Sequence, residues 1–247
     1  KTLTIPIAPG FPFALGGTQN SPVLNASLGM SISKPIDNDR GLSAFGSAQI
    51  GDRHTTHQND FTSHTASGRA GLRLEKEKQN FSIAADASML RLDAGGLARA
   101  DRKTAGVSGE WQYIPTDKDQ ISTTFQFSAM RNPQQSIRDV NRAMIGLNYG
   151  HAFADVPGTP IVFASIFGGI EDERADTNAD HFGRNFFGGR TGVSYQISEH
   201  QTAFAAFTYQ RSLYETSDPI FLVRRHDTFF DLSLGYRFQF DEHLSVS

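Results

Sequence analysis

The chain has 247 residues and a mass of 27.1 kDa, room for one large domain or two small ones. Its formal net charge of -3 excludes the basic footprint of a nucleic-acid-binding protein, so no nucleic-acid partner is expected. The absence of cysteine excludes disulfide scaffolds, thiolate metal sites and cysteine nucleophiles. The mean hydropathy is -0.37 and no apolar run approaches the length of a membrane helix, whereas 20 Phe and 23 Gly favour an all-β protein.

Apolar and polar residues alternate with a period of two along most of the chain, and helical spacing is almost absent. In chain order the alternating stretches include 24–33, 42–50, 66–75, 81–89, 105–113, 121–129, 143–151 and 230–240. Residues 161–170 are apolar at both parities, so the sequence does not decide which of their two faces points inward. About eleven strands of roughly nine to twelve residues are predicted, long enough to cross a bilayer at a tilt, whereas strands of soluble sandwiches have about five or six residues.

The links between these strands alternate in length. Short links are expected at 35–40, 76–80, 115–120, 154–159, 198–201 and 241–243, and long links at 51–63, 93–103, 131–141, 172–185 and 215–227. Outer-membrane barrels alternate in this way because their periplasmic turns are short and their extracellular loops long. The pattern predicts an all-β fold, an antiparallel up-and-down transmembrane β-barrel that occupies residues 1–247 as a single domain.

Aromatic residues of the apolar parity precede the short links. They are Trp111, Tyr113, Tyr149, Tyr195, Tyr236, Phe238 and Phe240. Amphipathic rings belong at the membrane–water boundary, so this set predicts a periplasmic aromatic girdle, with His151 beside it. The alternative, aromatic packing at one end of a soluble β-core, would require strand length, link length and ring position to coincide by accident.

The polar parity is expected to line the lumen of the barrel. Its charged and amide residues are Arg69, Arg73, Asp86, Glu110, Gln112, Asn148, Arg190, Arg237 and Gln239. Many small residues lie between them, which predicts a wide, wet interior. For any one of these residues, a network that merely solvates the wall is the alternative to a role in transport.

No constellation of an active site is evident, so no catalytic residue, cofactor or metal ion is expected and the chain is not interpreted as an enzyme. The histidines of the predicted loops have no paired nucleophile motif. The acidic run Glu171-Asp172-Glu173, followed by Asp176 and Asp180, lacks the ligand spacing and turn glycine of a calcium loop. We interpret it as a solvated loop.

Two apolar segments, 5–13 and 219–227, fall on the predicted extracellular side. Four successive apolar residues, 220–223, are costly to leave in water, so both segments are expected to fold inward as a plug or lid, or to contact a partner. The residues assigned to this role are Phe11, Phe13, Phe221, Leu222, Arg224, Arg225 and Asp227.

Both ends of the sequence interrupt the strand pattern. Lys1 follows neither an initiating Met nor a signal sequence, and residues 243–247 alternate like a strand that is starting. A closed single-chain barrel needs an even number of strands and no exposed edge. We therefore expect a fragment, truncated at both ends, of a barrel with about 12–14 strands.

Five stretches carry a family resemblance. They are Ile5–Leu15, Pro35–Leu42, Ser136–Arg142, Phe163–Glu173 and Asp218–Asp227, of which the last, continued through Tyr236, is the most specific. In their order they resemble the C-terminal barrel domain of the surface lipoprotein assembly modifiers, Gram-negative outer-membrane proteins with a periplasmic tetratricopeptide-repeat region ahead of the barrel. No helical repeat of that kind appears in these residues.

The resemblance implies a translocon in the Gram-negative outer membrane that helps a secreted or lipid-anchored client protein reach the cell surface. Its partners would be outer-membrane lipids and a lipoprotein or hemophore-like client, received by the periplasmic repeat domain that is absent here. No active-site residues carry over, because the implied activity is passage and assembly.

Three other classes remain open. A porin or exopolysaccharide exporter is the first, and a sugar conduit should present an aromatic ladder to the lumen; Phe45 and Phe204 are the exceptions to a mostly lipid-facing set of aromatics. A soluble secreted β-barrel, binding haem through a loop histidine, is the second. A barrel enzyme is the third, and the sequence places no Ser and His together on a strand edge.

Overall fold

The computed structural model describes residues 23–55, 62–93, 100–174, 182–198, 200–217, 222–239 and 245–246. The strands are β1 (Val23–Asp37), β2 (Leu42–Thr55), β3 (Thr62–Lys76), β4 (Gln79–Asp93), β5 (Ala100–Thr116), β6 (Asp119–Arg131), β7 (Val140–Ala152), β8 (Ile161–Glu173), β9 (Arg184–Ser198), β10 (Gln201–Ser217), β11 (Arg224–Gln239) and β12 (Ser245–Val246). The helix within these ranges is a single 3₁₀ turn, η1 (Ser136–Arg138). No helix of this part of the chain is long and apolar enough to cross a membrane.

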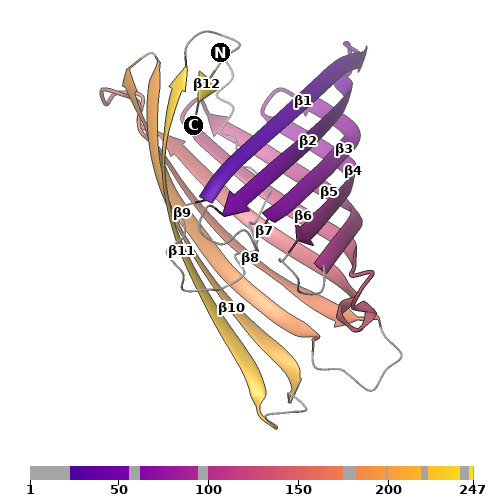
Figure 1. Cartoon of the computed structure of the whole chain (residues 1–247). Coiled ribbons are helices and arrows are strands. Elements are labelled where there is room, and N and C mark those ends of the chain that lie inside the picture. The colour runs from indigo at the N-terminus through magenta and orange to yellow at the C-terminus, as the bar shows by residue number, and fades with distance from the viewer. Residues whose placement is uncertain are drawn as a thin grey trace.

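All strands belong to one antiparallel sheet in which each strand pairs with the strands before and after it in the chain. Figure 1 shows this sheet wrapped into a curved wall, with the indigo β1 and the yellow β11 on its two sides. Among the described residues β1 pairs with β2 alone, and β12 adds two residue pairs to β11, so the wall is open there. The predicted all-β, antiparallel up-and-down architecture is confirmed.

The strands are longer than the side-chain pattern predicts. From β1 to β11 they run from 13 residues in β6 to 17 in β5 and β10. Most of the extra length lies at the strand ends that lead into the long links. For example, β2 continues to Thr55, although a loop was expected from residue 51. Backbone hydrogen bonds continue the ladder past the last apolar pair because they do not depend on side-chain polarity.

The alternation of links is present but less strict than predicted. Residues 77–78 and 117–118 form tight connections between neighbouring strands, at what we call the short-turn end of the wall. The link 153–160, at the same end, is as long as 132–139 at the opposite, long-loop end. It is a folded turn, closed by the backbone bonds Phe153 N to Pro160 O and Thr159 N to Val156 O.

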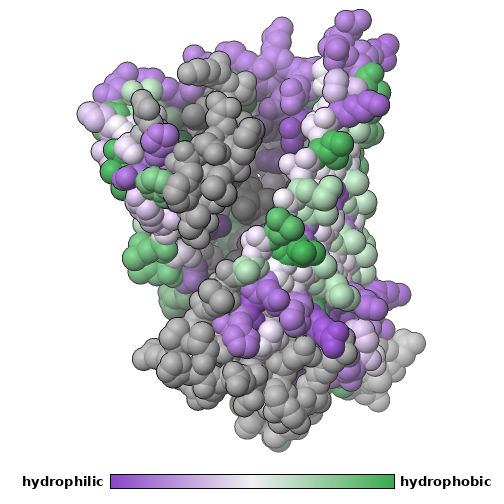
Figure 2. Space-filling view, turned by 45° about the horizontal axis from the view of Figure 1, so that its top comes forward, coloured by the Kyte–Doolittle hydropathy of each residue, from purple (hydrophilic) through white to green (hydrophobic). Residues whose placement is uncertain are grey.

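Burial is inverted relative to a soluble β-sandwich. In β6 the apolar Phe125 and Phe127 are 50% and 53% exposed, whereas Ser122 and Ser128, of the opposite parity, are 1% and 3% exposed. The same split recurs in β7, where Ile145 and Leu147 are exposed and Asn148 is buried. We call the apolar face outward and the polar face inward. Figure 2 shows the consequence on one side of the molecule: a white and green band between purple rims.

The two faces of β8, which the sequence left open, are resolved by its neighbour β9. The strand register places Phe163, Phe167 and Gly169 opposite Gly192, Gly188 and Phe186. A Cβ added at Gly188 would lie 2.6 Å from the Phe167 ring, and one added at Gly169 would lie 2.7 Å from the Phe186 ring. Each inward ring therefore covers a glycine of the adjacent strand, so the larger aliphatic residues Val162, Ile166 and Ile170 point outward.

Candidate functional site

The inward face of β7, β8 and β9 carries a row of three charged side chains near the long-loop end. The register pairs Arg142 with Glu171 and Glu171 with Arg184, so the three are direct cross-strand neighbours. Arg184 Nε lies 2.6 Å from Glu171 Oε2, and Arg142 Nε lies 3.7 Å from Glu171 Oε1. We call these residues the Arg142 row. One carboxylate thus bridges two guanidinium groups across three strands.

Two residues of the Arg142 row are buried, and further contacts continue the row on both sides. Glu171 is 5% exposed and Arg142 7%. The Arg142 guanidinium lies 4.5 Å from the centre of the buried Phe186 ring, a cation–π distance. On the other side Arg184 Nη1 donates to Ser212 Oγ at 3.4 Å, and its guanidinium lies 5.9 Å from the Tyr214 ring.

This placement corrects the interpretation of Glu171, Asp172 and Glu173 as part of a solvated loop, whereas Asp176 and Asp180 lie outside the described residues. Glu171, Asp172 and Glu173 are the last residues of β8, and the alternating parity directs Glu171 into the wall. Glu173 accepts hydrogen bonds from the backbone N–H groups of Phe182 and Gly183, the latter at 2.8 Å. The run was misjudged because a β-ladder tolerates consecutive carboxylates where inward arginines and backbone donors neutralise them.

A second inward cluster, formed by Arg69, Asp86 and Ser108, lies on β3, β4 and β5. Arg69 Nε lies 3.3 Å from Asp86 Oδ1, Arg69 Nη2 donates to Ser108 Oγ at 3.2 Å, and Ser108 Oγ donates to Asp86 Oδ2 at 2.5 Å. We call these residues the Arg69 cluster. The side chains of Arg69 and Asp86 are 26% and 28% exposed, so this cluster is wetter than the Arg142 row.

The remaining residues predicted for the lumen have the following neighbours. Gln112 Oε1 accepts from Asn80 Nδ2 at 2.7 Å, and Asn148 Nδ2 donates to Ser122 Oγ at 3.2 Å. Arg73 lies 3.8 Å from Glu75. The guanidinium groups of Arg73 and Arg69 both lie within 6 Å of the centre of the Phe45 ring. The Arg190 guanidinium lies 5.7 Å from the centre of the Phe163 ring. Glu110, Arg237 and Gln239 take strand positions opposite Ser82, Thr202 and Ser245. Their assignment to an aqueous lumen stays a prediction.

Inward aromatic residues are more numerous than the sequence suggested. Phe45 and Phe204 were the expected exceptions, but the structure adds Phe163, Phe167, Phe186 and Tyr214 to the inward face. The signal that could have found them is the pairing of Phe-rich and Gly-rich strands, since a ring needs a glycine beside it on a crowded wall. Phe167 and Phe186 are buried and present no free ring face for stacking on a sugar.

The predicted plug is described in part. Phe11, Phe13 and Phe221 lie outside the described residues. Leu222 is 79% exposed and Val223 62%, so these two do not fold against the inner wall as expected. Arg224, Arg225 and Asp227 begin β11. Arg225 Nη2 lies 2.8 Å from Asp227 Oδ2, and Tyr214 Oη donates to the same oxygen at 3.1 Å.

The predicted girdle residues lie at the short-turn ends of β5, β7, β9 and β11, on the outward parity, and Phe240 lies outside the described residues. Trp111 and Tyr113 stack with ring centres 6.3 Å apart. Asp119 is a shared acceptor there: Tyr149 Oη donates to its Oδ1 at 2.7 Å, and His151 Nδ1 lies 2.8 Å from the same atom. A membrane interface at this level stays a prediction.

Beyond the strands, an ion pair of a lysine and a carboxylate joins the links 117–118 and 153–160 at the short-turn end. Lys118 Nζ lies 2.6 Å from Asp155 Oδ2. The hydrogen bond and positive charge of this ammonium lower the pKa of Asp155.

Among the described residues no three His, Asp or Glu side chains come together as ligands of a metal ion. The chemistry that the inner wall offers is fixed charge and hydrogen bonding.

Comparisons with known proteins leave the family open. No protein-family model and no curated protein matches the sequence. Among solved structures, the chain is similar to the copper transporter OprC, with a TM-score of 0.45 and 12% identity over 89% of this chain and 44% of that one. It is also similar to the alcaligin outer-membrane receptor FauA from Bordetella pertussis, with a TM-score of 0.37 and 13% identity over 89% and 41% of the two chains. The chain thus spans less than half the length of these structures.

Proposed function

We propose that this chain forms the wall of a β-barrel in the Gram-negative outer membrane and that the barrel serves a translocon for a secreted or lipid-anchored client protein. The observation that carries the membrane placement is the inverted burial. Outward Phe, Ile and Leu side chains are exposed in a band between polar ends, while serines and an ion-paired glutamate are buried on the inward face (Figure 2). In water such a face is costly, whereas lipid tails cover it without cost.

Translocation of a protein client, rather than steady passage of small solutes, is supported by the inner wall of β7–β9. Open porins keep a polar, water-filled interior. Here Phe167, Phe186, Arg142 and Glu171 are buried, and the Arg142 guanidinium lies against the Phe186 ring. A wall of this kind favours an interior that opens for a client over one that stays open.

The client class follows from the resemblance of the five sequence stretches to surface lipoprotein assembly modifiers. Two of these stretches contribute to the packed region: Ser136–Arg142 forms η1 and the start of β7, and Phe163–Glu173 is nearly all of β8. A role in assembly and passage also fits a wall whose polar groups are engaged in ion pairs and hydrogen bonds.

The test is deletion of the gene followed by quantitative proteomics of the shaved cell surface and of the periplasm. We expect one or a few lipoproteins or secreted proteins to leave the surface fraction and accumulate in the periplasm. Complementation with the intact gene is the control for polar effects. An unchanged surface proteome would overturn the translocon role while leaving the membrane placement standing.

A porin or exopolysaccharide-export barrel is the competing function, favoured by Phe45, Phe163 and Phe204, inward rings that are not buried. Conductance of the purified full-length protein in planar bilayers separates the two. The translocon predicts long closed periods, whereas a steady open pore of nanosiemens scale would favour the porin. Loss of exported polysaccharide in the deletion strain, with normal surface proteins, would favour the exporter.

A further inference from the structure

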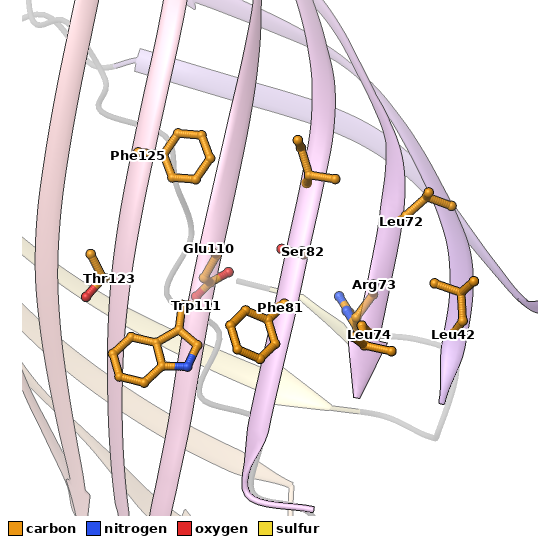
Figure 3. A pocket seen from close by; sticks show the side chains of 11 residues that line it. Leu42, Leu72, Arg73, Leu74, Phe81, Ser82, Glu110, Trp111, Thr123 and Phe125 are labelled. Atoms are coloured by element: carbon orange, nitrogen blue, oxygen red, sulfur yellow. The ribbon is translucent and has the colours of Figure 1, made fainter. Parts of the chain in front are cut away.

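The outward face carries an apolar groove of about 420 Å³ near the short-turn end of β2–β6. Figure 3 shows its lining side chains on neighbouring strands. The outward side chains that line it include Leu72, Leu74, Phe81, Trp111, Thr123 and Phe125. Its width across several strands distinguishes it from the gap between two side chains.

The groove exists because a glycine interrupts the ridge of large side chains on β5. Trp111 pairs with Phe81 on β4 and with Thr123 on β6. Gly109 is the neighbouring residue of the outward face along β5. The Phe125 ring lies over Gly109, where an added Cβ would be 2.2 Å from it. The ring is thereby turned toward β5, and an open trough remains beside it.

A cation stands at the short-turn end of this trough. Lys76 has the same outward parity as Leu72 and Leu74, and the ladder of β3 with β4 has no bulge between them. Lys76 is thus about 7 Å beyond Leu74 along the strand. Glu75 belongs to the opposite face, where it lies 3.8 Å from Arg73.

The polar edge of the groove is completed by Trp111. Its indole Nε1 donates to Gln79 Oε1 at 3.3 Å, and Gln79 is the residue paired with Lys76. The rings of Trp111 and Phe81 thus lie below a polar edge formed by Gln79 and Lys76. An apolar trough that ends at an amide and an ammonium has the polarity of a lipid: acyl chain below, headgroup above.

We propose that this groove binds an anionic phospholipid of the surrounding leaflet. One acyl chain lies against Leu72, Phe81 and Phe125, and the headgroup phosphate pairs with the Lys76 ammonium. The proposal rests on the membrane placement of the proposed function, and it adds a preferred lipid at a defined position on the wall.

The test uses the fluorescence of Trp111, the one tryptophan of these 247 residues. The full-length protein, with any tryptophan outside this region replaced by phenylalanine, is reconstituted in vesicles of phosphatidylethanolamine and phosphatidylglycerol. Brominated acyl chains quench tryptophan on contact, and they are placed on one lipid at a time. We expect brominated phosphatidylglycerol to quench Trp111 as if enriched about fivefold over its mole fraction, the effect of one lysine at an anionic surface.

Two variants probe the charge and the trough. Lys76→Gln should remove the enrichment, whereas Lys103→Gln, at the long-loop end of the same face, should keep it. Thr123→Phe fills the trough and should lower quenching by both lipids; Thr191→Phe, on the outward face of β9, is the matched control. In the double variant Trp111→Phe, Tyr149→Trp the single tryptophan stands at position 149, beside Asp119. Its quenching should show no preference for brominated phosphatidylglycerol over brominated phosphatidylethanolamine.

Quenching of Trp111 in proportion to mole fraction would overturn the lipid site and leave the membrane placement intact. No quenching by either brominated lipid would overturn both. A brominated triacyl lipopeptide that displaces phosphatidylglycerol and quenches more strongly would overturn the assignment to a bilayer lipid in favour of a client's acyl anchor.

Discussion

The inner faces of β2–β5 and of β7–β9 contain the same kinds of residue and differ in how tightly these are packed. Each holds arginine, a carboxylate and phenylalanine within contact distance: Arg69 with Asp86 on one side, Arg142 with Glu171 on the other. On β3 and β4 the ion-paired side chains keep more than a quarter of their surface, whereas on β7 and β8 they keep less than a tenth.

The difference comes from the neighbours of the charges. Phe186 and Phe167 fill the space between β8 and β9 because glycines stand opposite them, and Phe186 then closes over Arg142. The Arg69 cluster is surrounded by serines and small residues, and the Phe45 ring lies 5.7 Å from Arg69. A charged pair thus contributes to wall rigidity in one half and to hydration in the other, depending on whether aromatic rings exclude water around it.

The largest difference is expected for removal of the carboxylates. Glu171→Ala leaves two shielded guanidinium groups without their shared partner and should lower the free energy of unfolding by about 3–5 kcal/mol. Asp86→Ala, in the wetter cluster, should cost about 1 kcal/mol or less. Urea unfolding of the protein refolded into lipid vesicles, followed by tryptophan fluorescence, measures both. Equal losses in the two variants would remove the contrast between the halves.

Glycine substitution probes the packing itself. In Gly188→Ala the new methyl group would lie 2.3 Å from Tyr209 O and 2.6 Å from the Phe167 ring, and we expect a loss of about 1–3 kcal/mol. In Gly29→Ala, on the inward face of β1, the nearest atom is Ala48 O at 3.7 Å, so the change should stay within about 0.5 kcal/mol. The same unfolding assay serves, and a tolerated Gly188→Ala would show that the β8–β9 wall is loosely packed.

The smallest effect is expected in solvent access. Because the chain has no cysteine, single replacements give unique reporters. Ser47→Cys, exposed on the inward parity of β2, should react with a membrane-impermeant maleimide at least about tenfold faster than Ser128→Cys, buried on β6, where labelling requires local opening. Labelling of the unfolded proteins at equal rates is the control. Similar rates in the folded state would mean that one aqueous lumen reaches both walls.

Much of the fold was predictable from side-chain period. The alternation from Phe230 to Phe238 predicted β11 and the direction of its faces. These predictions succeed because a strand has only two faces, so one clear apolar residue orients all the others.

The residues that were missed lie where parity is ambiguous or where a strand continues into an expected loop. Arg142 and Arg184 stand beside or within the predicted long links, and Glu171 belongs to an acidic run that is typical of a solvated loop. The strands continue through these residues because their backbone groups hydrogen-bond to a neighbouring strand that is equally long. The length of the neighbouring strand cannot be seen in the sequence of one strand alone.

By itself the sequence determined the all-β class, the up-and-down order of strands and which side chains of each alternating strand share a face, since these depend on local period and link length. The tertiary structure alone decided which face of β8 points inward, that Glu171 joins Arg142 and Arg184, and that a trough opens beside Trp111. Each of these depends on what stands opposite in the next strand, a glycine, a ring or a charge, and cross-strand register is a property of the folded sheet.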